Sequence, residues 1–140
     1  MAFSEVYQGL QTGVVDGTEN TPSNVYTEKM HEVQKHATLS GHGYIGYAVI
    51  THKPFREGLP EDVRTQLKRA VADPSVYANV LAGSDNAQTL EAMKGAGTTE
   101  FQEMTPEEIG AWKEALMPVQ EEMADRIGAE PVAKVKAAVQ

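Results

Sequence analysis

Side chains that could do chemistry are few in this sequence, and their spacing matches no common catalytic or metal-binding pattern. Histidine is the usual general base and metal ligand near neutral pH, yet His36 and His42 lie six positions apart, which is no recognised metal spacing. The acid pair Glu107–Glu108 is explained by a helix start, and Glu121–Glu122 by a solvated helix face. Phosphate-binding glycine loops, the H-E-x-x-H motif and a nucleophilic serine elbow are all missing. We therefore expect no enzyme activity, no cofactor and no metal site.

The composition is that of an ordinary globular chain with an acidic surface. The 140 residues are 41% hydrophobic and 23% charged, and they include no cysteine, which excludes disulfide scaffolds and thiolate zinc sites. Twelve Lys and Arg against 20 Asp and Glu give a net charge of −8, which argues against nucleic acid as a partner. An anionic ligand would have to be held by local hydrogen-bond donors.

The elements that would position a site are mostly helices in the first half of the chain. Ser4 is a good helix cap, apolar residues follow at helical spacing, and Gly13 is a natural stop. Residues 14–17 are expected to form a short strand or an extended exit. Pro22 or Ser23 is expected to begin the next helix, which would extend to about residue 33.

A strand is expected where the pattern changes. Tyr44–Ile50 is almost entirely apolar without polar alternation, which indicates a strand covered on both faces, and it is far shorter than the roughly 20 residues that span a bilayer.

The second half predicts long helices around one more strand. A helix is expected from Pro60 or Glu61 to a stop at residues 95–97, with a kink or restart at Asp73–Pro74 and another interruption at residues 83–85. Residues 99–104 are expected to form a short strand. We predict an α/β class that is rich in helices and has few short strands.

The last long helix should begin at a capping box formed by Thr105 and Glu108, kink at Pro118 and end at Gly128. Its apolar stripe from Ile109 to Ile127 is expected to be core, and a short helix over residues 131–139 should follow.

The opening of the chain carries the most specific motif. From Phe3 to Asn20 it reads F-S-E-V-Y-Q-G-L-Q-T-G-V-V-D-G-T-E-N. This run resembles the solute-binding proteins of tripartite ATP-independent periplasmic (TRAP) transporters, whose pattern runs from F-x-E-V-Y through A-L-Q-T-G-V-V-D-G to Q-E-N. The resemblance continues in order through further segments, which are Tyr26–Lys29, Glu32–Lys35, Leu39–Tyr44, Leu59–Arg64 and Asp125–Gly128.

The resemblance implies a receptor that captures a small organic acid in the periplasm and delivers it to a membrane permease. Such proteins have two α/β lobes with the ligand between them, and His42-Gly43-Tyr44 with Gly46-Tyr47 resembles the dicarboxylate-binding branch. Residues 1–140 resemble only the C-terminal part of the family and are treated as one region. We expect the N-terminal lobe, the signal peptide and the family's carboxylate-binding arginine to be missing from this chain.

The resemblance also assigns ligand-binding residues. Asn20 matches an asparagine that helps to hold the ligand carboxylate, and its place before a helix start agrees with anion binding; the alternative is a turn cap. Phe3 matches an aromatic residue that packs against the ligand, or it packs only at the helix entry. Tyr44 and Tyr47 fall on the strand that lines the cleft, where core packing is the alternative. Asn24 is a further candidate, with a surface position as the alternative.

Two functional hypotheses follow from these observations. The first is the binding component of a TRAP transporter, of which this part alone binds carboxylates weakly or not at all. The second is a self-associating module, because a chain without its partner lobe exposes sheet edges and apolar surface that a second copy could cover.

Overall fold

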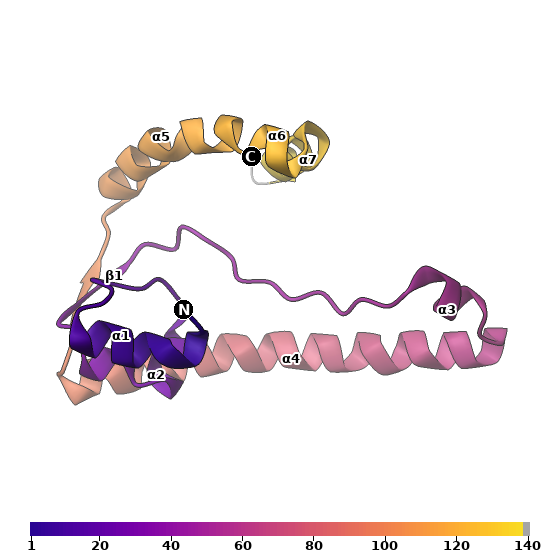
Figure 1. The fold of residues 1–140 in the computed structure, drawn as a ribbon, viewed down its shortest axis with the longest axis horizontal. Helices are drawn as coiled ribbons and strands as arrows, with labels where there is room; N and C mark the ends of the chain where they lie inside the picture. The colour runs from indigo at the N-terminus through magenta and orange to yellow at the C-terminus, as the bar shows by residue number, and fades with distance from the viewer. Residues whose placement is uncertain (139–140) are drawn as a thin grey trace. The chain divides into compact units, whose positions relative to one another are not determined.

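Helices make up most of the structure, a computed structural model that describes residues 1–138 (Figure 1). The helix-rich α/β class predicted from the sequence is confirmed. Two strands, β1 and β2, pair in a two-stranded sheet. The elements in chain order are η1 (Phe3–Glu5), α1 (Val6–Thr12), α2 (Pro22–Thr27), η2 (Met30–Glu32), β1 (His36–Leu39), α3 (Lys53–Glu57), α4 (Glu61–Ala96), β2 (Glu100–Glu103), α5 (Pro106–Glu122), α6 (Ala124–Ile127) and α7 (Ala129–Ala138).

The chain divides into two compact units. The first unit comprises Met1–Ala37 and Gly41–Phe101, and the second comprises Thr38–Ser40 and the chain from Gln102 onward. In the first unit α2 contacts α4 and η2, and α1 contacts η1 and η2. In the second unit α6 contacts both α5 and α7.

The core of the first unit is small and lies where the short helices meet the end of α4. Among residues 1–138 the buried apolar side chains are Leu10, Met30 and Met93, with exposed fractions of 7%, 0% and 1%. The helix that carries Leu10 ends as predicted, because Gly13 adopts the left-handed conformation with φ 72°. The Val14 N–H then donates to the Gly9 carbonyl at 2.9 Å, so residues 14–17 turn back and form no strand.

The helix that begins at Pro22 is shorter than predicted. It ends at Thr27, and Lys29 follows with a positive φ of 56° before η2 begins. A non-glycine residue in this conformation ends a helix, which explains why the apolar spacing did not extend α2 to residue 33.

Helix α4 is one continuous helix of 36 residues, so the predicted restart at Asp73–Pro74 and the interruption at residues 83–85 are wrong. Pro74 lacks the N–H that would bond to the Ala70 carbonyl, but Ala70 is exposed and water can take the place of that donor. The predicted stop is confirmed, because Gly97 adopts the left-handed conformation with φ 67°.

The predicted strand Tyr44–Ile50 is wrong. Residues 41–52 have no regular secondary structure, and Tyr44 and Tyr47 are 89% and 93% exposed. A strand forms only against a partner, and no strand among residues 1–138 pairs with this segment. The strand before α5 is confirmed as β2, whose Glu100 N–H donates to the Lys35 carbonyl at 2.8 Å.

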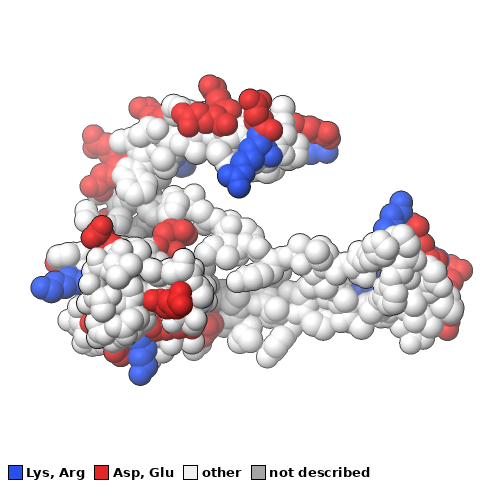
Figure 2. All heavy atoms as spheres, in the orientation of Figure 1, with Lys and Arg blue, Asp and Glu red and all other residues white. Residues whose placement is uncertain are grey.

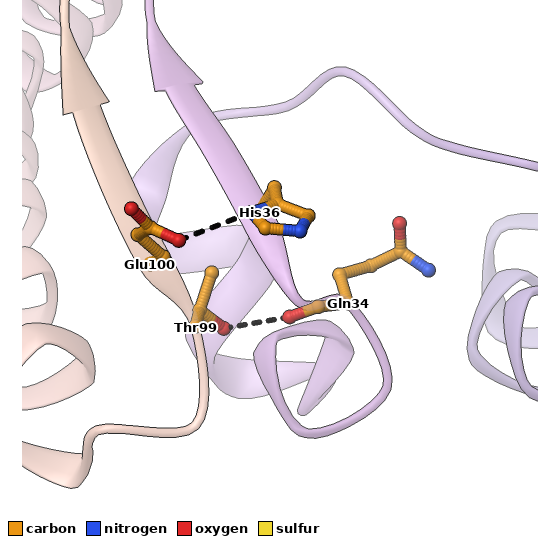
Figure 3. A network of polar contacts seen from close by, with 4 residues as sticks. All are labelled: Gln34, His36, Thr99 and Glu100. Carbon is orange, nitrogen blue, oxygen red and sulfur yellow. Dashed lines mark hydrogen bonds and ion pairs between the residues drawn. The ribbon is translucent and has the colours of Figure 1, made fainter.

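A buried hydroxyl joins the start of β2 to the chain before β1 (Figure 3). Thr99 is 7% exposed, and its Oγ1 lies 2.7 Å from the His31 carbonyl oxygen and 2.9 Å from that of Gln34. The neighbouring ion pair between His36 and Glu100, at 3.5 Å, is exposed and adds little stability. The Thr99 hydroxyl is therefore a buried side-chain contact that joins these segments beside the backbone bond from Glu100 to Lys35.

We predict that Thr99→Val destabilises the chain by about 1–3 kcal/mol, because valine keeps the shape but removes the single O–H that the His31 and Gln34 carbonyl oxygens share. Urea unfolding followed by circular dichroism measures the change. Thr98→Val is the matched control, since Thr98 is exposed and should shift the unfolding free energy little. Equal effects of the two substitutions would contradict the role of the Thr99 hydroxyl.

The second unit begins at the predicted capping box. The Glu108 N–H donates to Thr105 Oγ1 at 3.3 Å, and Glu108 Oε2 accepts from the Thr105 N–H at 2.7 Å and from the Thr105 hydroxyl at 2.9 Å. These bonds, first from the Thr105 backbone and then from its side chain, hold the pKa of the Glu108 carboxyl below its ordinary value of 4.5.

The lowered pKa of Glu108 predicts a pH dependence. The ionised cap stabilises the folded chain above about pH 4.5, and this contribution is lost as the pH falls through the lower pKa of the folded state. We expect the difference in unfolding free energy between wild type and Glu108→Gln to shrink on acidification. Glu114→Gln, at an exposed position of the same helix, should show no such pH-dependent difference.

The rest of the second unit departs from the predicted pattern in its packing. Helix α5 continues through Pro118 and ends at Glu122. The short helix α6 follows and ends at Gly128, whose φ is 100°. The stripe is not the core that was predicted: Trp112 and Leu116 are 46% and 45% exposed, Ile109 and Met123 are half-buried, and the described part of this unit buries no side chain. The final helix begins at Ala129 rather than Pro131, and its predicted end at residue 139 lies outside the described residues.

Candidate functional site

Asn20 lies at the centre of a hydrogen-bonded turn before α2. Its Oδ1 accepts from the Thr21 N–H at 2.9 Å and from Asn24 Nδ2 at 2.6 Å. An amide oxygen has two lone pairs, so both acceptor positions are used and the orientation of the Asn20 amide is fixed. No hydrogen bond within residues 1–138 uses Asn20 Nδ2. The turn therefore presents a partly buried N–H₂ group that can donate to an acceptor such as a carboxylate.

The backbone donors around this turn are largely taken. Pro22, the first residue of α2, has no N–H, and the Thr21 N–H is bonded to Asn20. The Ser23 N–H donates to Oδ1 of Asn86 at 3.0 Å, and Asn86 comes from α4, 63 positions along the chain. The side-chain amide of Asn20 is thus a donor that remains for a ligand at this turn.

The structure brings two of the five sequence candidates into contact. Asn24 donates to Asn20 and so orients it. Phe3 lies in η1 and is 45% exposed, and Tyr44 and Tyr47 lie in the irregular segment 41–52. In the described part of the chain these three aromatic residues make no hydrogen bond or ring contact with either asparagine. Their roles as ligand contacts stay predictions, although the exposure of both tyrosines does not agree with core packing.

Asn86 was not found from the sequence. It shares one face of α4 with Leu90 and Met93, since spacings of four and three residues place side chains on one side of a helix. All three are less exposed than the residues of α4 before them, apart from Arg64. The signal in the sequence is an asparagine on an apolar helix face. Asparagine is unfavourable inside a helix unless its side chain has a hydrogen-bond partner, so its presence there indicates such a partner.

Other surfaces fit an organic acid poorly. A shallow hollow at the first turns of α4 is lined by Glu61, Asp62, Thr65 and Gln66, and its two carboxylates would repel an anion. Figure 2 shows acidic side chains over much of α5 on the visible face. Residues 1–138 contain no group of three His, Asp or Glu side chains placed to hold a metal ion. None of the helices in the same residues is both long and apolar enough to span a membrane.

Comparisons with known proteins agree on one family. The model of the bacterial extracellular solute-binding proteins, family 7, matches residues 1–127. The C4-dicarboxylate-binding periplasmic protein DctP of Rhodobacter capsulatus is 66% identical over 138 residues, which are 99% of this chain and 41% of that protein. This chain therefore spans about two fifths of the length of that relative.

Solved structures show the same similarity. A TRAP periplasmic solute-binding protein from Shewanella oneidensis with bound succinate has a TM-score of 0.87 at 33% identity, over 99% of this chain and 45% of that one. The ectoine-binding protein of the TeaABC TRAP transporter from Halomonas elongata has a TM-score of 0.88 at 28% identity, over 98% of this chain and 46% of that one. The resemblance seen in the sequence is confirmed: the chain belongs to the family 7 extracellular solute-binding proteins, which serve TRAP transporters.

Proposed function

We propose that this chain is the part of a TRAP solute-binding protein that supplies Asn20 to a site for a small organic acid, a C4-dicarboxylate or a related carboxylate. The complete protein captures the acid in the periplasm and delivers it to the membrane permease of the transporter. It binds and releases its ligand without chemical change, needs no cofactor, and has no nucleic acid partner.

The observation that carries this proposal is the fixed amide of Asn20. Both lone pairs of Oδ1 are occupied, so the group offered to a ligand is an N–H donor, which suits a carboxylate and does not suit a cation. The chain has a net charge of −8, so an anion needs such a local donor. The 66% identity with a C4-dicarboxylate-binding protein supports the choice of ligand.

The chain by itself should bind organic acids weakly or not at all. Its relatives are more than twice as long. In the two-lobe arrangement that the resemblance implies, a site between the lobes needs donors from both. Each charge-assisted hydrogen bond that is missing removes about 1.5–3 kcal/mol of binding free energy. Phe3, Tyr44, Tyr47 and Asn24 are proposed as further contacts or supports on this side of the site.

Isothermal titration calorimetry tests the proposal. Succinate, L-malate and a neutral diamide of succinate are titrated into the complete protein encoded by the gene and into the 140-residue chain. We expect the two acids to bind the complete protein, the diamide to bind much more weakly, and the short chain to give little heat. Equal binding of the acid and its diamide would show that no carboxylate is recognised.

A second candidate function is self-association of the chain, and the exposed apolar surface favours it. Val49 and Ile50 are 77% and 87% exposed, and on α4 Val76, Tyr77 and Val80 are each about two-thirds exposed. Figure 2 shows the middle of α4 almost without charged side chains on the visible face. An uncharged extended segment and an uncovered helix are surfaces that a second copy could cover.

Light scattering coupled to size-exclusion chromatography distinguishes this candidate from the first. A self-associating chain should show a dimer whose fraction rises with protein concentration and falls in Tyr47→Lys and Ile50→Lys, because charges disrupt strand pairing. A monomer at every concentration would exclude self-association and leave the binding function untouched.

A further inference from the structure

The first turn of α2 has no cap of its own. The Thr21 side chain, at the N-cap position, makes no capping hydrogen bond, and Pro22 has no N–H. The next N–H, that of Ser23, needs an acceptor from elsewhere because the first N–H groups of a helix have no partner within it. Asn86 Oδ1 supplies this acceptor at 3.0 Å. A side chain of α4 therefore caps α2.

The capping residue stands on the best-packed part of α4. Asn86 is followed on the same helix face by Leu90 and by Met93, which is 1% exposed, and α4 contacts α2. The earlier turns of α4, up to residue 85, are exposed apart from Arg64. Asn86 thus lies where α4 enters the core of the first unit, and its amide oxygen is held in place by a packed helix.

The cap is linked to the candidate ligand donor by one short turn. Asn20 Oδ1 accepts from the Thr21 N–H and from Asn24 Nδ2, and Ser23 lies between these two residues. Within residues 1–138, the Ser23–Asn86 bond is the only hydrogen bond that joins this turn to a segment distant in the sequence. Movement at Ser23 would be passed to Asn20 through the turn.

We propose that Asn86 is a positioning residue for ligand binding: through the Ser23 N–H it fixes the turn that aims the Asn20 amide at the ligand carboxylate. This inference rests on the proposed function of Asn20. Asn86 itself has no contact with the ligand in this proposal. Its effect on affinity comes from order in the turn, because a preformed donor avoids the entropy cost of ordering on binding.

The test compares Asn86→Ala with Asn86→Asp in the complete protein. Alanine removes the acceptor, so we expect faster hydrogen exchange of the Ser23 amide and about three- to tenfold weaker succinate binding, the range of one neutral hydrogen bond. Aspartate keeps an acceptor oxygen in the same place, so it should restore the protection of the Ser23 amide. Any loss of affinity in Asn86→Asp should shrink at high salt, where its added charge is screened.

Asn79 provides the matched control, since it lies on an exposed part of the same helix. Asn79→Ala and Asn79→Asp should change neither Ser23 exchange nor succinate affinity. Asn86→Ala with wild-type affinity, whatever its exchange rate, would overturn the inference and leave the proposed function standing. A wild-type protein that binds no organic acid would contradict the proposed function. Faster exchange of the Ser23 amide in Asn86→Ala would then show that Asn86 is a structural cap only, and this result would also overturn the inference.

Discussion

Asn20→Asp is expected to abolish organic acid binding by the complete protein while leaving its fold intact. The aspartate keeps the Oδ1 oxygen that accepts from Thr21 and Asn24, so the turn can form as before. It replaces the N–H₂ donor with a second anionic oxygen that faces the ligand carboxylate. The loss of a charge-assisted hydrogen bond alone weakens binding by about 10- to 150-fold, and the repulsion between two carboxylates adds to it.

Calorimetry with succinate measures this effect, and two further variants separate its parts. Asn20→Ala removes the donor without adding charge, and it also removes the Oδ1 acceptor of the turn, so its loss of succinate affinity should be at least that of one hydrogen bond. Asn79→Asp adds the same charge at an exposed position of α4 and should bind succinate like the wild type. If Asn20→Asp and Asn79→Asp bound succinate equally well, Asn20 would have no contact with the ligand carboxylate.

Features that depend on local chemistry could be predicted from the sequence. The capping box of Thr105 and Glu108 and the stops at Gly13 and Gly97 are all where they were expected. Each depends on the conformational freedom of one glycine or on two side chains three residues apart. Such signals act within a single turn of chain, so neither packing nor a distant partner is needed for them to operate.

Features that depend on a partner could not be predicted in the same way. Tyr44–Ile50 has the composition of a buried strand, but a strand also needs a second strand beside it, and composition does not show whether this chain supplies one. Pro74 is a local helix breaker, yet α4 continues through it, because one lost hydrogen bond on an exposed helix costs less than ending a helix of 36 residues.

The candidate site also has a part that the sequence indicates and a part that depends on a distant partner. Asn20 was found through the resemblance of the run from Phe3 to Asn20 to a known family, which is a comparison and not a physical derivation. The bond between Ser23 and Asn86 joins residues 63 positions apart, so no pattern along the chain reports it. Only the structure shows that Asn24, in the first turns of α2, fixes the amide of Asn20. It also shows that Asn86 of α4 anchors the same turn through Ser23.

Met93→Ala is expected to destabilise the first unit strongly, as truncation of the equally buried Met30 would. Met93 is 1% exposed, and Leu10 and Met30 are the other buried apolar side chains among residues 1–138. Truncation of a buried methionine leaves a cavity and costs about 2–5 kcal/mol, a large share of the ~5–15 kcal/mol that stabilises a typical domain. Because α4 carries Asn86 on the same face, the loss should also speed the exchange of the Ser23 amide.

Urea unfolding followed by the circular dichroism of the helices measures the effect of Met93→Ala. Met117→Ala is the matched control, since Met117 is a helical methionine that is 49% exposed and should change the unfolding free energy by less than about 1 kcal/mol. Met93→Leu conserves volume and should cost less than about 1.5 kcal/mol. Wild-type stability in Met93→Ala would mean that the packing of α4 on α2 does not hold this unit together, and the anchor beneath the Asn20 turn would have to lie elsewhere.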